Sequence, residues 1–102
     1  MLRQTSLNFM LYEWDNVKAK LNLAKHGVSF EEALSVFNDE FALLIYDEEH
    51  SSDEERFLLL GKSLVNNLLL VVHCYKEKDV IRIISARKAT KNESKEYLGK
   101  KA

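Results

Sequence analysis

Residues 68–72 read Leu-Leu-Leu-Val-Val, and this run of five apolar side chains decides the fold class. A continuous apolar run bounded by polar residues is typical of a strand that is covered on both faces. We therefore predict a central strand over Asn67–Tyr75.

Three further segments are rich in β-branched, leucine and aromatic residues: Phe41–Tyr46, Arg56–Leu60 and Asp79–Ala86. Polar stretches separate all four segments, which is the pattern of consecutive strands. Because the connections are short, neighbouring strands are expected to run antiparallel. The pattern predicts a four-stranded antiparallel sheet.

Two helices are predicted before the sheet, over Asn16–His26 and Phe30–Phe37. Apolar residues recur in the first helix at helical spacing and form a stripe: Val17, Leu21 and Ala24. Gly27 supplies a left-handed residue that ends this helix. Ser29 and Glu32 form a capping box at the start of the second helix. The two segments predict a helical hairpin.

A third helix is predicted near the C-terminus, over Lys91–Leu98. Thr90 and Glu93 form a second capping box at its start, and Gly99 closes it. Two helices, four strands and a final helix together predict an α+β fold.

Length and composition exclude several classes of protein. The chain has 102 residues and one cysteine, which suits one domain without an internal disulfide. No apolar run approaches the roughly 18 residues that span a bilayer, and residues 1–8 lack the apolar stretch of a signal peptide. We expect one soluble domain in the reducing cytoplasm, with no membrane contact.

Charge is distributed unevenly along the chain, although the formal net charge is only −1. Residues 31–56 carry a net charge of −9, whereas residues 1–30 carry +2 and residues 76–102 carry +5. This asymmetry predicts a surface for a polyanion beside an acidic surface for a basic partner. The alternative is that the charges only solvate exposed faces.

The sequence offers no motif for a metal ion or an organic cofactor. The available soft ligands are His26, His50, His73 and Cys74. They lack the spacing of a zinc site, and the acidic run at residues 47–55 lacks the pattern of a calcium loop. The glycines are isolated, so there is no glycine-rich phosphate loop. We expect no metal and no cofactor, and we interpret residues 47–55 as a solvated acidic turn.

Cations and one histidine lie at or near the ends of the predicted strands: Arg56, His73, Lys76, Arg82 and Arg87. Ends of adjacent strands meet in a meander, so these side chains are expected to converge. An arginine fork binds phosphate through two parallel hydrogen bonds, and histidine exchanges protons near neutral pH. These groups suit metal-free RNA cleavage, in which a base takes the 2′-hydroxyl proton and cations stabilise the transition state. Surface salt bridges for the arginines and a half-buried strand position for His73 are the alternatives.

Several segments together resemble one known family. They are Tyr12-Glu13-Trp14-Asp15, Lys18, Asn22, Lys25-His26-Gly27-Val28-Ser29-Phe30-Glu31-Glu32-Ala33, Asp47-x-x-His50-Ser51, Glu55-Arg56, Gly61-x-Ser63, Val71-Val72-His73, Ile81-Arg82-Ile83-Ile84-Ser85-Ala86-Arg87-Lys88-Ala89-Thr90, Glu93 and Tyr97. In this order they are similar to the BrnT toxins. The resemblance divides the chain into an N-terminal extension, residues 1–11, and a single BrnT-like domain, residues 12–102. Met10 is an alternative candidate for the first residue.

The resemblance implies a RelE-like fold and a ribonuclease that arrests translation as the toxin of a type II toxin–antitoxin pair. It also implies a protein partner, the BrnA antitoxin, and contact with DNA only through that partner. By position, it points to Arg82 and Arg87 as the main phosphate-facing residues, with Arg56 and His73 behind them. Further catalytic candidates are His50 and Tyr97, and candidate RNA-binding residues are Lys76, Lys88 and Lys91.

The leading prediction is therefore a metal-independent endoribonuclease toxin that a BrnA-like antitoxin neutralises. One alternative is a non-catalytic module that binds the antitoxin and co-represses the operon, and another is a scaffold domain. The chain departs from the family pattern at two places. Asn66-Asn67 stands where many relatives carry Gly-Arg, and Lys76 stands where relatives often have arginine, so one cation and one bidentate fork are missing.

Overall fold

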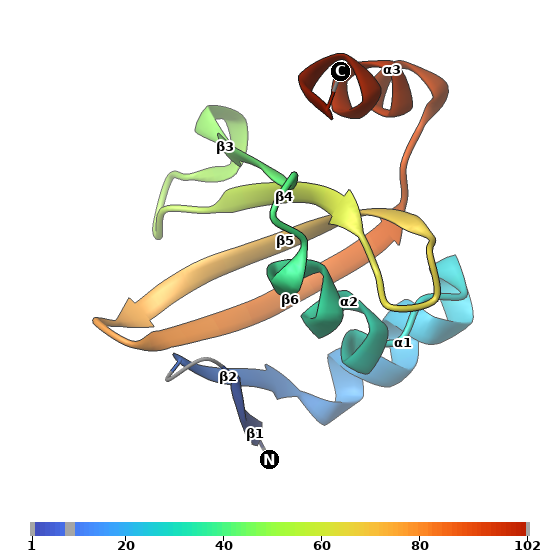
Figure 1. The fold of residues 1–102 in the computed structure, drawn as a ribbon. Helices are drawn as coiled ribbons and strands as arrows, with labels where there is room; N and C mark the ends of the chain where they lie inside the picture. The colour runs from blue at the N-terminus through green and yellow to red at the C-terminus, as the bar shows by residue number, and fades with distance from the viewer. Residues whose placement is uncertain (1, 8–9, 102) are drawn as a thin grey trace.

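The structure is a computed structural model that describes residues 2–7 and 10–101 (Figure 1). The strands in these residues are β1 (Leu2–Leu7), β2 (Met10–Asp15), β3 (Leu43–Tyr46), β4 (Phe57–Lys62), β5 (Leu68–Glu77) and β6 (Val80–Lys88). The helices are α1 (Asn16–His26), α2 (Phe30–Ser35) and α3 (Lys91–Lys101), and the 3-10 turns are η1 (Val36–Asn38) and η2 (Glu48–His50). In the part of the chain that the structure describes, no helix is long and apolar enough to cross a membrane.

The strands form one mixed sheet in the order β1-β2-β6-β5-β4-β3. The predicted antiparallel meander is present as β3 to β6. The prediction of a four-stranded, purely antiparallel sheet is wrong, because β2 pairs in parallel with β6 and β1 extends that edge. Glu13 of β2 is buried beside Arg82 of β6, a contact over 69 positions that no local pattern reports. Because β2 begins at Met10, the predicted domain boundary after residue 11 falls inside this strand.

The two helices before β3 begin where the sequence predicts. Asp15 caps α1 by accepting a hydrogen bond from the backbone N–H of Val17 at 2.8 Å, and Gly27, with φ of 70°, ends this helix. α2 ends at Ser35, two residues before the predicted end, and continues as η1. The predicted helical hairpin therefore differs in detail, because its second arm is a six-residue helix and both arms pack against β6.

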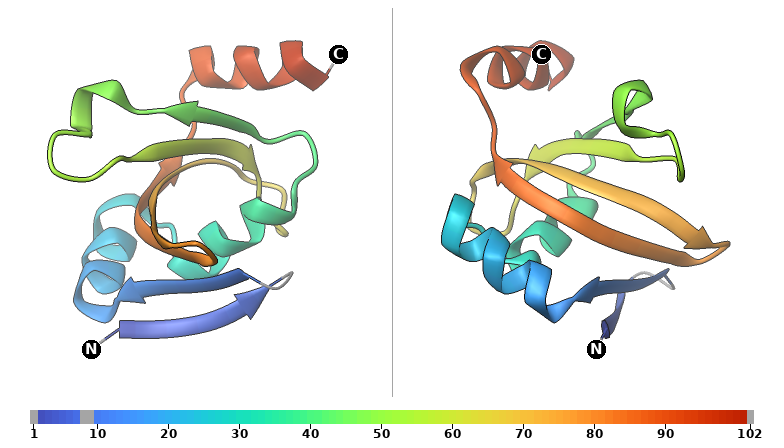
Figure 2. Two further views of the ribbon diagram at one scale, coloured as in Figure 1. Left: turned by 90° about the vertical axis from the view of Figure 1, so that its left-hand side faces the viewer. Right: turned by 180° about the vertical axis from the view of Figure 1, so that it is seen from behind.

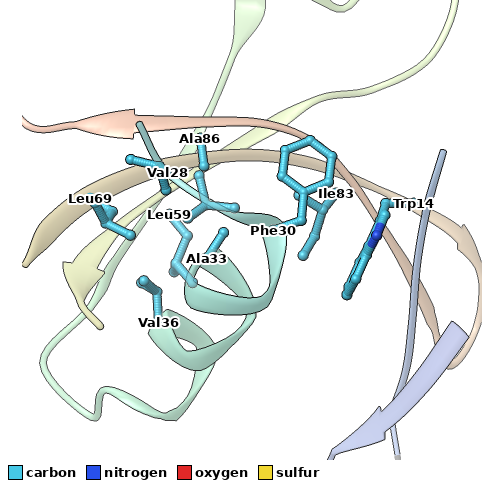
Figure 3. Packing of buried hydrophobic residues seen from close by; sticks show 10 residues of the cluster. Trp14, Val28, Phe30, Ala33, Val36, Leu59, Leu69, Ile83 and Ala86 are labelled. Atoms are coloured by element: carbon cyan, nitrogen blue, oxygen red, sulfur yellow. The ribbon is translucent and has the colours of Figure 1, made fainter. Parts of the chain in front are cut away.

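The main core lies between α2, η1 and one face of the sheet, which we call the covered face (Figure 3). Its buried side chains are Trp14, Val28, Phe30, Ala33, Val36, Leu59, Leu69, Val71, Ile83 and Ala86. Trp14 and Phe30 meet edge to face, with ring centroids 6.0 Å apart. Such aromatic pairs add to the stabilisation that their buried area provides.

The opposite face of the sheet, which we call the open face, is covered at one end by α3. A smaller cluster forms there from Leu60, Leu70 and Tyr97. The Tyr97 hydroxyl donates a hydrogen bond to Oδ2 of Asp39 at 2.6 Å, which ties α3 to the chain before β3. The views in Figure 2 place α3 at the end of the molecule opposite to β1 and β2.

α1 lies along β6 beyond the point where its pairing with β2 ends. The Asn22 side chain acts as a strand partner there, because its amide donates to the Ala86 carbonyl at 2.8 Å and its oxygen accepts from the Ala86 N–H at 3.1 Å. These bonds fix the side of α1 that faces the sheet. The apolar stripe of α1 consequently faces solvent, although an amphipathic helix normally turns its stripe toward the core.

Candidate active site

The open face carries an open pocket of about 390 Å³. Its lining residues are Asp47, Glu49, His50, Arg56, Leu58, Leu70, Val72, Ser85 and Arg87. The apolar residues come from β4 and β5 at alternate positions, which point to the same face of a sheet. The charged residues come from the turn around η2, the start of β4 and the end of β6. The pocket therefore has an apolar floor and a charged rim.

His50 stands on the rim, and its side chain is 61% exposed. Its Nδ1 lies 3.1 Å from Oδ2 of Asp47. Because a carboxylate accepts hydrogen bonds, this contact favours a proton on Nδ1 and leaves the lone pair on Nε2. Ser51 fastens the turn to the next strand: its hydroxyl donates to the Asp47 carbonyl at 2.5 Å and accepts from the Arg56 N–H at 2.9 Å.

Arg56 directly precedes β4 and also lines the pocket. Its Nε is buried and has no hydrogen-bond partner among the described residues. Leaving a buried donor unpaired is costly, so an acceptor that reaches this position gains the full value of the hydrogen bond. Arg56 is thus the residue of the pocket most clearly short of an acceptor.

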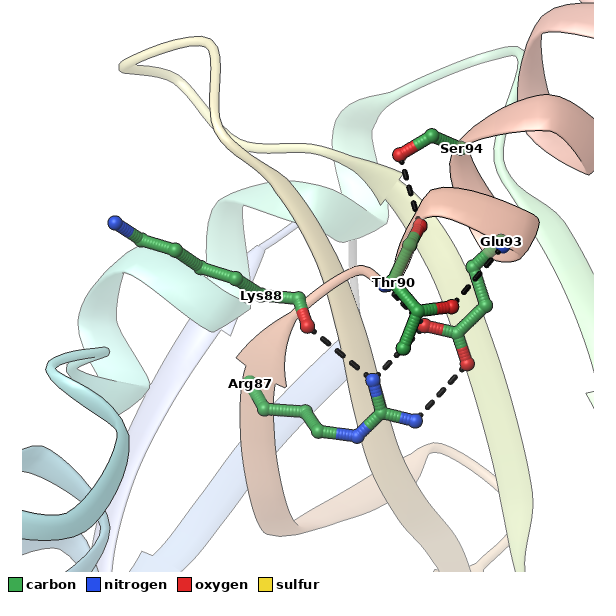
Figure 4. A network of polar contacts seen from close by, with 5 residues as sticks. All are labelled: Arg87, Lys88, Thr90, Glu93 and Ser94. Carbon is green, nitrogen blue, oxygen red and sulfur yellow. Dashed lines mark hydrogen bonds and ion pairs between the residues drawn. The ribbon is translucent and has the colours of Figure 1, made fainter.

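Arg87 closes the pocket on the side of α3 (Figure 4). Its Nη1 and Nη2 donate to the two carboxylate oxygens of Glu93 at 2.8 and 2.9 Å. Glu93 also accepts from the Thr90 N–H at 2.8 Å, as the predicted capping box requires. The hydrogen bonds between them lower the pKa of Glu93 and raise the pKa of Arg87, so both groups stay charged. The start of α3 therefore fixes the plane of the guanidinium group.

The structure does not bring His73 into this pocket. His73 follows Val72, a pocket residue, and successive strand residues point to opposite faces. The ring is fully buried on the covered face among Phe37, Phe57 and Tyr75, with centroids 5.0, 6.1 and 5.5 Å away. Burial lowers the pKa of His73 to about 4. His73 therefore stays neutral at neutral pH.

Arg82 and Tyr97 also lie outside the residues that line the pocket. Arg82 Nη2 and Nε lie 2.5 and 2.7 Å from Oε2 of Glu13 on β2. Tyr97 is fully buried between α3, to which it belongs, and the sheet, and burial together with its bond to Asp39 raises its pKa to about 12. In this structure both side chains hold elements of the fold together.

The three lysines predicted to bind RNA are exposed. Lys76 Nζ lies 2.5 Å from Oε2 of Glu54, a contact that lowers the pKa of Glu54. Lys88 follows Arg87 at the end of β6, and Lys91 opens α3. Figure 4 shows the Lys88 side chain directed away from Arg87. Lys88 and Lys91 are therefore close in sequence to the pocket residue Arg87. Lys76 lies near the C-terminal end of β5, beyond the pocket residue Val72.

Sequence reasoning did not assign a role in the site to Asp47, Glu93 or Ser85. The Asp47-x-x-His50 spacing places these two residues one turn apart, and this spacing could have indicated that Asp47 contacts His50. Glu93 appeared only as a helix cap, because the bond between Arg87 and Glu93 depends on where α3 starts. Among residues 2–7 and 10–101, no three His, Cys, Asp or Glu side chains are arranged to hold a metal ion.

Fold and pocket define a class: a small α+β protein with histidine and arginine side chains around an open pocket on a sheet face. The family model described as "Ribonuclease toxin, BrnT, of type II toxin-antitoxin system" matches residues 14–93, and the chain belongs to this family. The resemblance predicted from the sequence is confirmed. Membership implies an RNA target and an antitoxin partner.

Among solved structures, the crystal structure of the Brucella abortus ribonuclease toxin, BrnT, is similar to the chain. The TM-score is 0.55 and the identity is 24%, over 76% of this chain and 94% of that chain. This similarity shows the fold. No curated protein matches the chain.

Proposed function

We propose that this ribonuclease toxin cleaves RNA in the open-face pocket without a metal ion, by attack of a ribose 2′-hydroxyl on the adjacent phosphorus. The observation that carries the proposal is that His50, oriented by Asp47, shares one pocket with Arg56 and Arg87. A base and two cations around one phosphodiester supply what this reaction needs.

In the proposed step, Nε2 of His50 takes the proton from the 2′-hydroxyl. The 2′-oxygen forms a bond to phosphorus, and the bond from phosphorus to the 5′-oxygen breaks. The protonated His50, or water, returns a proton to the leaving 5′-oxygen. The products are an RNA end with a 2′,3′-cyclic phosphate and an RNA end with a 5′-hydroxyl. Asp47 stabilises the imidazolium that forms during the step.

The two arginines have different parts in this proposal. Arg56, which lines the pocket, shifts its side chain toward a non-bridging phosphate oxygen, so that its Nε–H, which is buried and unpartnered among the described residues, gains an acceptor. Arg87, fixed by Glu93, places its charge beside the same phosphate as negative charge develops. Lys88 and Lys91 are proposed to bind flanking phosphates.

The proposed partner is a BrnA-like antitoxin that covers the pocket in the cytoplasm and that alone contacts DNA. Family membership supports an antitoxin in general. An uncovered pocket of this kind would cleave cellular RNA, so a dedicated inhibitor follows from the proposed activity.

A second candidate is a non-catalytic module that only binds the antitoxin. One observation favours it: both terminal nitrogens of Arg87 already donate to Glu93, which occupies the fork that would bind phosphate.

The test is cleavage of a labelled RNA oligonucleotide by the purified protein in excess EDTA. We expect products with 2′,3′-cyclic phosphate ends, and no cleavage where the attacking nucleotide is 2′-deoxy.

Arg87→Ala should lower the cleavage rate by about 100-fold or more, since one donor to developing charge is worth about 3 kcal/mol. Arg82→Ala, on the same strand but outside the pocket, is the matched control and should change the rate less than about threefold. Activity that requires added magnesium, or that both variants retain, would overturn the proposal. Inactive wild-type protein that still binds the antitoxin would favour the second candidate.

A further inference from the structure

The outward side of α1 carries apolar residues that folding does not bury. We call Val17, Leu21 and Ala24 the α1 stripe; Val17 and Leu21 are 65% and 64% exposed. The inward side is occupied by Asn22, which bonds to β6. Residues at this spacing form one continuous row on a helix. The stripe is therefore an apolar row with no partner among the described residues.

The α1 stripe has a basic rim. With 100° between successive helical residues, Lys20 flanks it on one side, and Lys18 and Lys25 flank it on the other. The sequence of α1, Asn-Val-Lys-Ala-Lys-Leu-Asn-Leu-Ala-Lys-His, contains no acidic residue. An apolar row between two basic borders matches a partner surface that has an apolar row between acidic borders.

The α1 stripe is continuous with the proposed active site. A hollow of about 210 Å³ lies between α1 and β6, and Leu21 and Ser85 are among the residues that line it. Ser85 also lines the open-face pocket. A partner seated on the stripe would therefore reach the border of the pocket without leaving the surface of the protein.

We propose that the antitoxin docks on α1 with an amphipathic helix whose apolar side covers Val17 and Leu21 and whose acidic residues pair with Lys18 and Lys25. The proposal rests on the proposed function for the existence of that antitoxin, and it adds where and with what chemistry the antitoxin binds. The bound helix projects across Ser85 and blocks the approach of RNA to the pocket.

Charge and shape favour this occupant over three others. A second copy of this chain would bring two basic rims together, which like-charge repulsion opposes. RNA would use the lysines but would leave the apolar row without an apolar contact. A lipid surface needs a larger apolar face than one short row on an 11-residue helix.

The experiment measures binding of the purified cognate antitoxin to full-length toxin by surface capture. Val17→Ser with Leu21→Ser should raise Kd at least tenfold, chiefly through faster dissociation. Lys18→Glu with Lys25→Glu should slow association several-fold at low salt. The matched controls are Leu64→Ser, at a residue that is 84% exposed in the turn before β5, and Lys78→Glu, in the β5–β6 turn. Both controls should bind as the wild type does.

A crosslinking measurement tests the chemistry of the occupant. A photoreactive benzoylphenylalanine in place of Val17 should crosslink to an antitoxin segment with acidic residues around an apolar helical row. Crosslinks to a basic or extended segment would overturn the proposal. Stripe variants that bind the antitoxin as tightly as the wild type would also overturn it. If those variants keep their antitoxin affinity but lose self-association, RNA binding or vesicle binding, the stripe has another occupant and the proposal is wrong.

RNA cleavage in the same preparations separates this inference from the proposed function. The stripe variants should cleave RNA at the wild-type rate and resist inhibition by the antitoxin. If wild-type toxin is inactive but binds the antitoxin through the stripe, catalysis fails and the docking surface stands. If the protein cleaves RNA but no antitoxin contacts α1, the docking surface fails and catalysis stands.

Discussion

His50 and His73 lie on opposite faces of the same sheet and meet opposite surroundings. On the open face, His50 is exposed and bonded to the Asp47 carboxylate. On the covered face, His73 is packed between aromatic rings, and its Nε2 is buried without a partner among the described residues. A single position along β5 separates His73 from the pocket residue Val72. The comparison teaches that position relative to the two faces of the sheet, more than residue type, decides which histidine borders the open-face pocket.

The largest effect should separate the two histidines in catalysis. His50→Gln removes the proposed base and should lower the cleavage rate by about 1,000-fold. His73→Phe, which suits the aromatic surroundings, should change the rate of the folded protein by less than about threefold. Initial rates at equal concentrations of folded protein check this prediction. A strong loss in His73→Phe with little loss in His50→Gln would reverse the assignment.

The next effect concerns the dependence of stability on pH. Burial lowers the pKa of His73 to about 4, from 6.5. Between these values the unfolded chain binds a proton that the folded chain does not, so the free energy of unfolding falls as pH falls from 6.5 to 4. The loss from this one group approaches about 3 kcal/mol. Urea unfolding at several pH values should show a shallower fall in His73→Phe than in the wild type. Equal slopes in the two proteins would contradict the burial of a neutral imidazole.

A smaller effect should distinguish the two arginines of β6 by stability. Glu13 is 7% exposed at its side chain, so Arg82→Ala leaves a buried carboxylate without its arginine and should lower the free energy of unfolding by about 2 kcal/mol. Arg87→Ala removes a more exposed pair and should cost about 0.5 kcal/mol. Adding Glu13→Gln to Arg82→Ala should recover part of the loss. Equal costs for the two single variants would show that burial does not separate the pairs.

The smallest effect tests whether Glu93 positions Arg87. Glu93→Gln keeps an acceptor for the Thr90 N–H but loses the charged, bidentate partner of the guanidinium. The cleavage rate should fall about fivefold, or about 1 kcal/mol, with KM changed less than kcat. Arg87→Lys with Glu93→Gln should not restore activity, because lysine lacks the planar fork. A faster rate in Glu93→Gln would mean that Glu93 masks Arg87 instead of positioning it.

Local patterns predicted the parts of the fold that depend on neighbouring residues. The capping boxes at Ser29 and Thr90, the end of α1 at Gly27 and the order of β3 to β6 agree with the structure. The missed parts depend on distant contacts. β2 joins the sheet beside Arg82, and the orientation of α1 is set by the bonds from Asn22 to Ala86, 64 positions away.

The candidate site shows the same difference between features set by neighbouring residues and features set by distant contacts. Convergence of Arg56 and Arg87 at strand ends could be predicted from a meander, and the structure places both in one pocket with His50. The separation of His73 from that pocket could not be predicted, because it depends on which face of β5 the helices before β3 cover. The catalytic roles of His50, Arg56 and Arg87 stay predictions until the cleavage rates of the variants are measured.

The side-chain amide of Asn22 has a consequence for the behaviour of the protein at high concentration. An open strand edge is a template on which other chains can add, and this is how many sheet proteins aggregate. At Ala86, the side-chain amide of Asn22 forms hydrogen bonds with the backbone N–H and C=O to which a strand of another molecule would bind. Closure of the sheet at this edge therefore depends on the side chain of Asn22, which limits the addition of other chains without a further strand of the protein itself.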